Sequence, residues 1–188
     1  MAERDGASAA LRLRRATARD RRALARLIEA SARELCAVDY TPAQIEGALA
    51  GAFGVDSQLV ADGTYFVVED TDEQGRLVAC GGWSYRRTLF GGDAEAGRDA
   101  GSLDPARDAA KIRAFFVDPA YARRGLGRRL LERCEAEARA RGFTRFDLMA
   151  TRAGTRLYGR FGYRAGEPVD YDLGGGLTID FVPMSKEP

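Results

Sequence analysis

Two glycines, Gly125 and Gly127, stand among arginines where an apolar strand gives way to a helical pattern, in AYARRGLGRRLLERCEAEARARG. The first turn of a helix presents unpaired backbone N–H groups and the positive end of the helix dipole, which together bind anions. Glycine allows a ligand to approach the backbone because it has no Cβ. Arg123, Arg124 and Arg128 add positive charge. The stretch is therefore typical of a pyrophosphate site, the alternative being a tight turn with solvated arginines.

Composition excludes several other chemistries. The chain has no histidine, so Ser-His-Asp and Cys-His nucleophiles are excluded and the commonest metal ligand is missing. Cys36, Cys80 and Cys134 are widely spaced, and none forms a CxxC pair. We therefore expect no disulfide framework and no metal, and we expect Cys80 and Cys134 to pack in the core.

Charge and the N-terminal segment indicate where the chain works. The formal net charge is +1, so any electrostatic recognition is local, and neither nucleic acid nor a membrane is expected as a partner. Residues 1–10 are small and polar, lack the apolar core of a signal peptide, and predict a disordered leader. No run is long enough to span a bilayer, so we expect a cytoplasmic protein.

Two capping boxes predict where the first helices begin. Thr17 is followed by Asp20 three residues later, after a strand-like alternation over 11–15. Thr41 is likewise followed by Gln44, with a proline between them at the first helical position. The pattern predicts two N-terminal helices, the second extending to Phe53.

The middle of the chain reads as β-structure interrupted by a long loop. The runs at 64–70 and 76–90 flank the turn-like TDEQG and predict an antiparallel hairpin. The glycine-rich segment 91–108 is too long for an ordinary connection, so it is either a functional loop or a surface excursion. The run AAKIRAFFVDP ends in residues that are apolar on both faces, which predicts a central fourth strand.

The remaining patterns complete one domain. The helix that begins near Leu126 is followed by the strand FTRFDLMAT, the short helix AGTRLYGRF and two last strands joined around GGG. We predict a single α+β domain over residues 11–188. It has a mixed central sheet of about seven strands, flanked by about four helices.

Two stretches resemble the GNAT superfamily of N-acetyltransferases. AFFVDPAYARRGLGRRLLERCEAEARARGF is similar to its acyl-CoA-binding motif, Q/R-x-x-G-x-G/A between a strand and a helix, with Ala122 in place of Gln or Arg. TRAGTRLYGRFGY resembles the downstream pattern N-x-x-A-x-x-L-Y-x-x-x-G-F, with Thr151 and Gly154 in place of Asn and Ala. The resemblance covers nearly all of the chain from the first strand to Met184, most specifically Lys111–Tyr163.

The resemblance implies where acetyl-CoA binds. It implies a GNAT-like fold in which the fourth and fifth strands splay apart, with pantetheine in the gap and the pyrophosphate on the backbone amides that start the next helix. Tyr158 matches the family tyrosine that protonates the leaving thiolate. The implied coenzyme-binding residues are Phe115, Phe116, Val117, Arg123, Arg124, Gly125, Leu126, Gly127, Arg128 and Thr151.

The general base stays open. The family often has a glutamate in the fourth strand, but Arg113 stands near that position. Without histidine, the base is a carboxylate such as Glu69 or Asp70, a water relay, or the substrate itself. Arg113 either holds an acidic group of the acceptor or faces solvent.

Two residues and one loop are candidates for the acceptor site. Trp83, on the predicted third strand, either lines an acceptor pocket or packs in the core. Tyr40 lies in the loop between the first two helices, which often shapes specificity in this family, and the 91–108 loop is a candidate cover.

The resemblance implies an N-acetyltransferase that moves an acetyl group from acetyl-CoA to a primary amine of a small molecule or peptide by direct attack. The alternative is a catalytically idle acyl-CoA sensor or partner-binding module. Nucleic-acid binding through the arginine-rich helix is disfavoured, because Glu132, Glu135 and Glu137 interrupt its charge. A homodimer through the last strands and the acyl chain length stay open.

Overall fold

The structure, a computed structural model, describes residues 10–95 and 98–188, so residues 1–9 of the predicted leader lie outside it. The α-helices are α1 (Arg21–Leu35), α2 (Pro42–Leu49), α3 (Ser57–Ala61), α4 (Leu126–Ala140) and α5 (Thr155–Arg160), with short 3₁₀ turns η1 (Ala18–Asp20) and η2 (Pro119–Tyr121). The strands are β1 (Leu11–Arg15), β2 (Tyr65–Asp70), β3 (Arg76–Ser84), β4 (Ala110–Val117), β5 (Phe146–Ala150), β6 (Arg164–Ala165), β7 (Val169–Gly174) and β8 (Leu177–Lys186).

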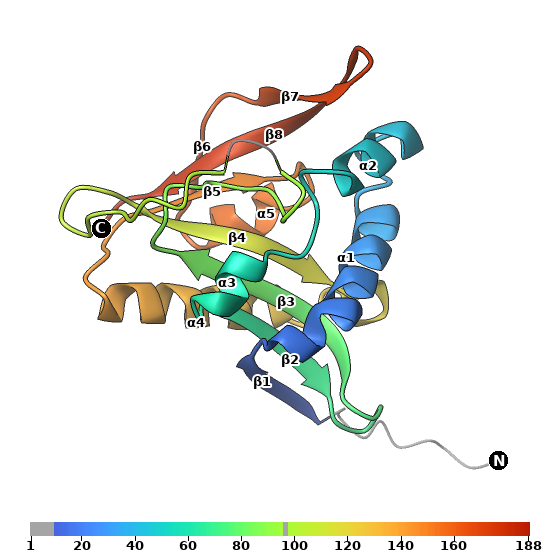
Figure 1. The fold of residues 1–188 in the computed structure, drawn as a ribbon, viewed down its shortest axis with the longest axis horizontal. Coiled ribbons are helices and arrows are strands. Elements are labelled where there is room, and N and C mark those ends of the chain that lie inside the picture. Colours follow the sequence, from blue (N-terminus) through green and yellow to red (C-terminus); the bar gives the residue numbers. More distant parts are fainter. Residues whose placement is uncertain (1–9, 96–97) are drawn as a thin grey trace.

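The strands form one mixed sheet, which confirms the predicted α+β class (Figure 1). The strand order is β1-β2-β3-β4-β5-β8-β6, with β7 paired to β8 in a hairpin. Strands β4 and β5 are parallel because α4 crosses over between them, whereas the other pairs are antiparallel. The predicted β2–β3 hairpin and central β4 are confirmed.

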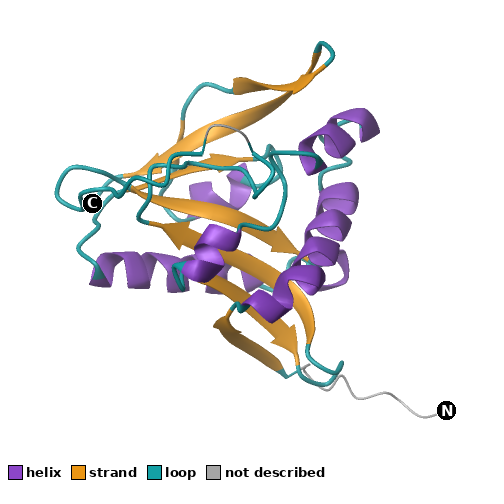
Figure 2. Ribbon diagram, viewed as in Figure 1, coloured by secondary structure: helices purple, strands orange, loops and turns teal. Residues whose placement is uncertain are grey.

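Each face of the sheet has its own core, and helices cover both (Figure 2). Successive side chains of a strand point to opposite faces. Phe66 and Val68 therefore pack with α4 and α5, while Tyr65 and Val67 pack with α1 and α2. Burying each such large apolar side chain contributes about 1.5–3 kcal/mol. The cysteines Cys80 and Cys134 are fully buried, as expected.

Both predicted capping boxes form, but α2 is shorter than predicted. The Thr41 hydroxyl accepts from the N–H of Gln44, and the Gln44 side chain accepts from the N–H of Thr41. The extension of α2 to Phe53 is wrong, because α2 ends at Leu49 and the chain turns through the glycine-containing segment 50–54. The N–H of Phe53 donates to the carbonyl of Ala48 at 2.7 Å, which closes that turn.

An irregularity in β4 opens the centre of the sheet. Ala114 has a φ of +56°, which L-residues rarely adopt, and the pairing of β3 with β4 shifts register beside it. Gly81 lies opposite, and a Cβ there would come within 2.7 Å of the Phe115 ring. Strand β4 pairs with β5 only from Ala110 to Ile112. The predicted separation of the two strands is confirmed.

Within residues 10–95 and 98–188, no helix is long and apolar enough to cross a membrane.

The long segment after β3 folds back on itself along the sheet. In this loop, Arg86 forms an isolated antiparallel bridge with Ser102, and the N–H of Thr88 donates to the carbonyl of Asp99. The segment is thus a return loop, and its residues Leu89, Phe90 and Gly91 line a cavity beside β4.

Candidate active site

A cavity of about 280 Å³ lies in the gap between β4 and β5. Its walls come from both sides of the sheet. Ser31 and Leu35 of α1 line one side, Leu157 and Tyr158 of α5 line the other, and residues 112–117 of β4 lie between them. The cavity therefore passes through the sheet where strand pairing stops.

The start of α4 forms one end of this cavity. Gly125 is the N-cap residue in the left-handed conformation, with a φ of +80°, which glycine adopts without a Cβ penalty. Gly127 lines the cavity, and a Cβ there would lie 3.0 Å from Leu157 Cδ2. The N–H of Arg129 donates to the Gly125 carbonyl at 3.0 Å, which is the first hydrogen bond within the helix. The N–H groups of the residues before Arg129 therefore have no partner in the helix and point out of its N-terminal end.

The arginines around this helix start are exposed, whereas the intervening leucine is not. The Arg124 guanidinium lies over the Tyr121 ring at 4.8 Å, and Arg128 pairs with Glu132 at 2.8 Å. Leu126 is buried in the core, so only its backbone is available to a ligand. Arg123 is exposed and has a φ of +64°. The charge predicted beside the glycines is therefore present at the surface.

The three predicted residues of β4, Phe115, Phe116 and Val117, contact different parts of the structure. The Phe115 ring packs edge-on against Tyr158 at 6.1 Å, on the α4 side of the sheet. The Phe116 ring contacts Phe53 at 5.7 Å, on the α1 side. The N–H of Val117 donates to the Ser31 hydroxyl at 3.2 Å. All three residues line the cavity.

Tyr158 and Thr151 line the same cavity. The Tyr158 ring packs against Phe115 and Tyr163, and burial raises the pKa of its hydroxyl above the ordinary value. The hydroxyl is therefore a neutral proton donor at physiological pH. Thr151 precedes α5, and its hydroxyl accepts from the N–H of Gly154 at 3.2 Å.

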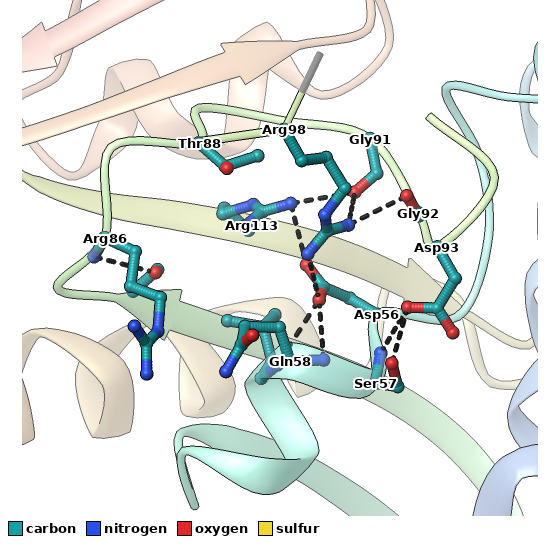
Figure 3. A network of polar contacts seen from close by, with 12 residues as sticks. Asp56, Ser57, Gln58, Arg86, Thr88, Gly91, Gly92, Asp93, Arg98 and Arg113 are labelled. Carbon is teal, nitrogen blue, oxygen red and sulfur yellow. Dashed lines mark hydrogen bonds and ion pairs between the residues drawn. The ribbon is translucent and has the colours of Figure 1, made fainter. Parts of the chain in front are cut away.

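Arg113 also lines the cavity and belongs to a buried ionic cluster (Figure 3). Its Nη2 forms an ion pair with Asp56, lying 2.7 Å from Oδ2, although this oxygen has no hydrogen-bond partner among the described residues. The same Nη2 donates a hydrogen bond to the Gly91 carbonyl at 2.8 Å. Arg98 Nη2 lies 2.7 Å from Asp56 Oδ1. Burial lowers the pKa of Arg113, and the Asp56 charge opposes this shift. Arg113 thus does not face solvent.

The candidate bases Glu69 and Asp70 lie at the far end of β2, outside the cavity wall. Glu69 pairs with Arg12 and Arg14 on β1, and these arginines lower the pKa of its carboxyl against the opposing effect of burial. Asp70 accepts a hydrogen bond from the Tyr121 hydroxyl at 2.6 Å. Among the described residues that line the cavity, none is an aspartate or glutamate.

Two residues predicted for the acceptor pocket lie elsewhere in the structure. Trp83 is fully buried on the α4 side, with Phe143 at 6.1 Å, and does not line the cavity. The Tyr40 hydroxyl donates to the Asp180 carbonyl at 2.8 Å and accepts from the N–H of Arg152 at 3.0 Å. Tyr40 thus joins the α1–α2 loop to the β8 side of the sheet and stays outside the cavity wall.

An aromatic wall completes the cavity on the α1 side, and the sequence did not indicate it. Phe53 and Phe181 lie 5.8 Å apart, and Phe90 lies 5.9 Å from Phe181. All three rings line the cavity, together with Met149. Their sequence positions are far apart, so no local spacing marks them as one surface.

Sheet order, strand separation and helix start define the fold of an acyltransferase domain, and comparison with known families agrees. The profile of the Acetyltransferase (GNAT) family matches residues 24–163, so the chain belongs to this family. No curated protein matches the sequence closely enough to count as a relative.

Solved structures share the fold at low sequence identity. The chain is similar to a GCN5-related N-acetyltransferase from Rhodopseudomonas palustris, with 22% identity, a TM-score of 0.67 and coverage of 94% of this chain and 95% of that one. It is also similar to the PaiA N-acetyltransferase of Thermoplasma acidophilum in complex with coenzyme A, with 15% identity, a TM-score of 0.62 and coverage of 95% and 99%. The ribosomal-protein-S18-alanine N-acetyltransferase of Escherichia coli has 18% identity, a TM-score of 0.58 and coverage of 94% and 93%.

Proposed function

We propose that the protein transfers an acetyl group from acetyl-CoA to a primary amine of a small molecule or peptide, by direct attack of the amine on the thioester. Family membership supports acetyl-CoA-dependent N-acetylation in general. The observation that carries the proposal for this chain is the cavity that joins the start of α4, the β4 backbone left unpaired by β5, and Tyr158.

The cavity has the features that acetyl-CoA requires. The free N–H groups at the start of α4 suit the pyrophosphate. The β4 backbone beyond Ile112 is left unpaired by β5 and suits pantetheine, although the Val117 N–H already donates to the Ser31 hydroxyl. Gly127 leaves room between the helix start and Leu157. The residues proposed to bind the coenzyme are Phe115, Phe116, Val117, Arg123, Arg124, Gly125, Leu126, Gly127, Arg128 and Thr151.

Residues of the cavity supply the chemistry that direct transfer needs. The amine lone pair forms a bond to the carbonyl carbon while the carbon–sulfur bond breaks. A β4 backbone N–H stabilises the negative charge that develops on the carbonyl oxygen. Tyr158 gives its hydroxyl proton to the departing thiolate, and the phenolate recovers a proton from solvent.

The amine must also lose a proton, and the base that accepts it has to lie near the cavity. Glu69 and Asp70 are engaged in other contacts away from the cavity. We propose that a water relay or the substrate itself takes the proton, because no aspartate or glutamate among the described residues lines the cavity.

A panel of amines tests the proposal. Purified protein is incubated with acetyl-CoA and a set of amino acids, arylalkylamines, polyamines and short peptides, and free thiol and acetylated product are measured. Transfer to at least one amine is expected. Saturable acetyl-CoA binding without transfer to any amine would instead indicate an idle acyl-CoA sensor.

A further inference from the structure

The α1 side of the cavity is available to the acceptor. The start of α4 and Tyr158 lie on the α4 side, where the coenzyme is proposed to enter. The α1 side is lined by Leu35, Phe53, Phe90 and Phe181, with Arg113 beside them. If the amine of the acceptor reaches the thioester from this side, the rest of the acceptor molecule contacts these residues.

The aromatic wall of this side suits an apolar body. Phe53 packs edge-on against Phe116, and its centroid lies 5.8 Å from that of Phe181. Phe53 and Phe181 are both buried. Aromatic side chains contribute large contact areas and prefer edge-to-face or offset partners. The acceptor end therefore favours an aliphatic or aromatic group over a polar one.

The charge of this side is positive. Among the described residues that line the cavity, Arg113 alone carries a formal charge. Asp56 neutralises only one of the two guanidinium groups that contact it, Arg113 and Arg98, since both lie 2.7 Å from the same carboxylate. Neither arginine pairs with a second carboxylate in the described part of the chain. The cluster thus keeps one excess positive charge, which is shared between Arg113 in the cavity wall and Arg98, whose side chain is 19% exposed and does not line the cavity.

A donor of this cluster lacks a partner. The Arg113 side chain is 2% exposed, and its Nε is buried without a hydrogen-bond partner among the described residues. A buried donor without an acceptor is costly, and native proteins rarely keep one. Its Nη2, in contrast, is held by Asp56 and the Gly91 carbonyl, which fix the guanidinium in place (Figure 3).

We propose that the acceptor is an α-amino acid with an apolar, preferably aromatic, side chain, whose carboxylate binds Arg113 and whose side chain packs against Phe53, Phe90 and Phe181. This inference rests on the proposed function. A small shift of the Arg113 side chain, whose Nε is buried in the structure, lets the carboxylate supply the acceptor that Nε lacks and balance the excess charge. The same charge opposes polyamines and other acceptors that carry several ammonium groups.

Matched substrates test the recognition of the carboxylate. L-phenylalanine and L-phenylalaninamide have the same side chain and nearly the same size, but only the first has a carboxylate. The amide has the less basic amine, so amine protonation alone would make it the better substrate. We expect kcat/KM to be about tenfold to a hundredfold higher for L-phenylalanine, as for a hydrogen bond to a charged group. Equal or higher kcat/KM for the amide overturns the proposal.

Two variants of the cluster locate the recognition. Arg113→Gln and Arg98→Gln each remove one positive charge and leave Asp56 paired with the other arginine. Only Arg113 lines the cavity between β4 and β5. The preference for L-phenylalanine over its amide is expected to fall about tenfold or more in Arg113→Gln and by less in Arg98→Gln. Equal losses contradict a direct role of Arg113, and thermal unfolding of both variants checks that they fold.

A binding measurement separates failure of this inference from failure of the proposed function. N-acetyl-L-phenylalanine, the expected product, is titrated calorimetrically into protein saturated with coenzyme A. Saturable binding that weakens in Arg113→Gln supports the inference even without turnover. Transfer to other amines without any binding of this product overturns the inference and leaves the proposed function standing. Absence of acetyl-CoA binding overturns the proposed function itself.

Discussion

Replacing Tyr158 by phenylalanine removes one oxygen and little else. The ring keeps its contacts with Phe115 at 6.1 Å and Tyr163 at 5.7 Å. Burial, and to a lesser extent Cys134, raises the pKa of the Tyr158 hydroxyl, and no hydrogen bond to a described residue contributes to this shift. The free energy of unfolding should therefore change by less than the roughly 0.5–1.5 kcal/mol that one hydrogen bond contributes. Loss of a general acid lowers kcat by about 10²–10⁴-fold, or about 2.7–5.4 kcal/mol in the activation barrier.

The assay measures kcat by thiol release with the best amine of the panel, together with the acetyl-CoA dissociation constant and urea unfolding. Tyr163→Phe is the matched control, because the Tyr163 hydroxyl donates to Glu135 at 3.0 Å and Tyr163 does not line the cavity. This control loses a hydrogen bond to a carboxylate, so it should lose about 1.5–3 kcal/mol of stability and keep its kcat. A Tyr158→Phe enzyme with a kcat within about threefold of wild type refutes the general-acid role.

Three other perturbations test the framework of the site. Gly125→Ala places a Cβ at a φ of +80°, so urea unfolding should show a loss of about 1–2 kcal/mol, and no loss contradicts the left-handed cap. Asp56→Asn leaves two guanidinium groups without their carboxylate and should cost about 3–5 kcal/mol, more than Arg98→Gln; equal urea midpoints contradict this. Burial raises the pKa of Tyr40 to about 12, so the folded chain retains a proton that the unfolded chain releases above about pH 10. Stability from this group is fully present below about pH 10 and falls as the pH rises toward 12, which urea midpoints at several pH values would show.

Local sequence signals predicted the elements whose cause is local. The Thr41 and Gln44 capping box needs only neighbouring residues, and it forms. The glycine at the start of α4 was predicted from its place between a strand and a helix, and its φ of +80° explains why glycine stands there. The helix α3 was missed because five residues are too few to show a helical repeat of apolar positions. Its one local signal is the N-cap Asp56, whose Oδ1 accepts from the N–H groups of Gln58 and Leu59.

The acceptor side could not be predicted, because its contacts join distant parts of the chain. Phe53 contacts Phe181, and Asp56 contacts Arg113, only after the sheet brings the α2–α3 connection, β4 and β8 together. Arg113 was singled out from the sequence, but nothing local distinguished a buried ion pair from a solvent-facing residue. Similarly, Trp83 could not be assigned to one face of the sheet until the register of β3 and β4 was known.

The most direct measurement is calorimetric titration of acetyl-CoA into wild type, Gly127→Glu and Gly159→Glu. Gly127 lines the cavity at the start of α4, so a glutamate there obstructs and repels the pyrophosphate. Gly159 is exposed on α5, and no described atom lies within 4 Å of the place that a Cβ would take, so it controls for the added charge. Saturable binding to wild type and Gly159→Glu, lost in Gly127→Glu, is the predicted result. No binding to wild type, or equal binding to all three proteins, would contradict acetyl-CoA binding between β4 and β5.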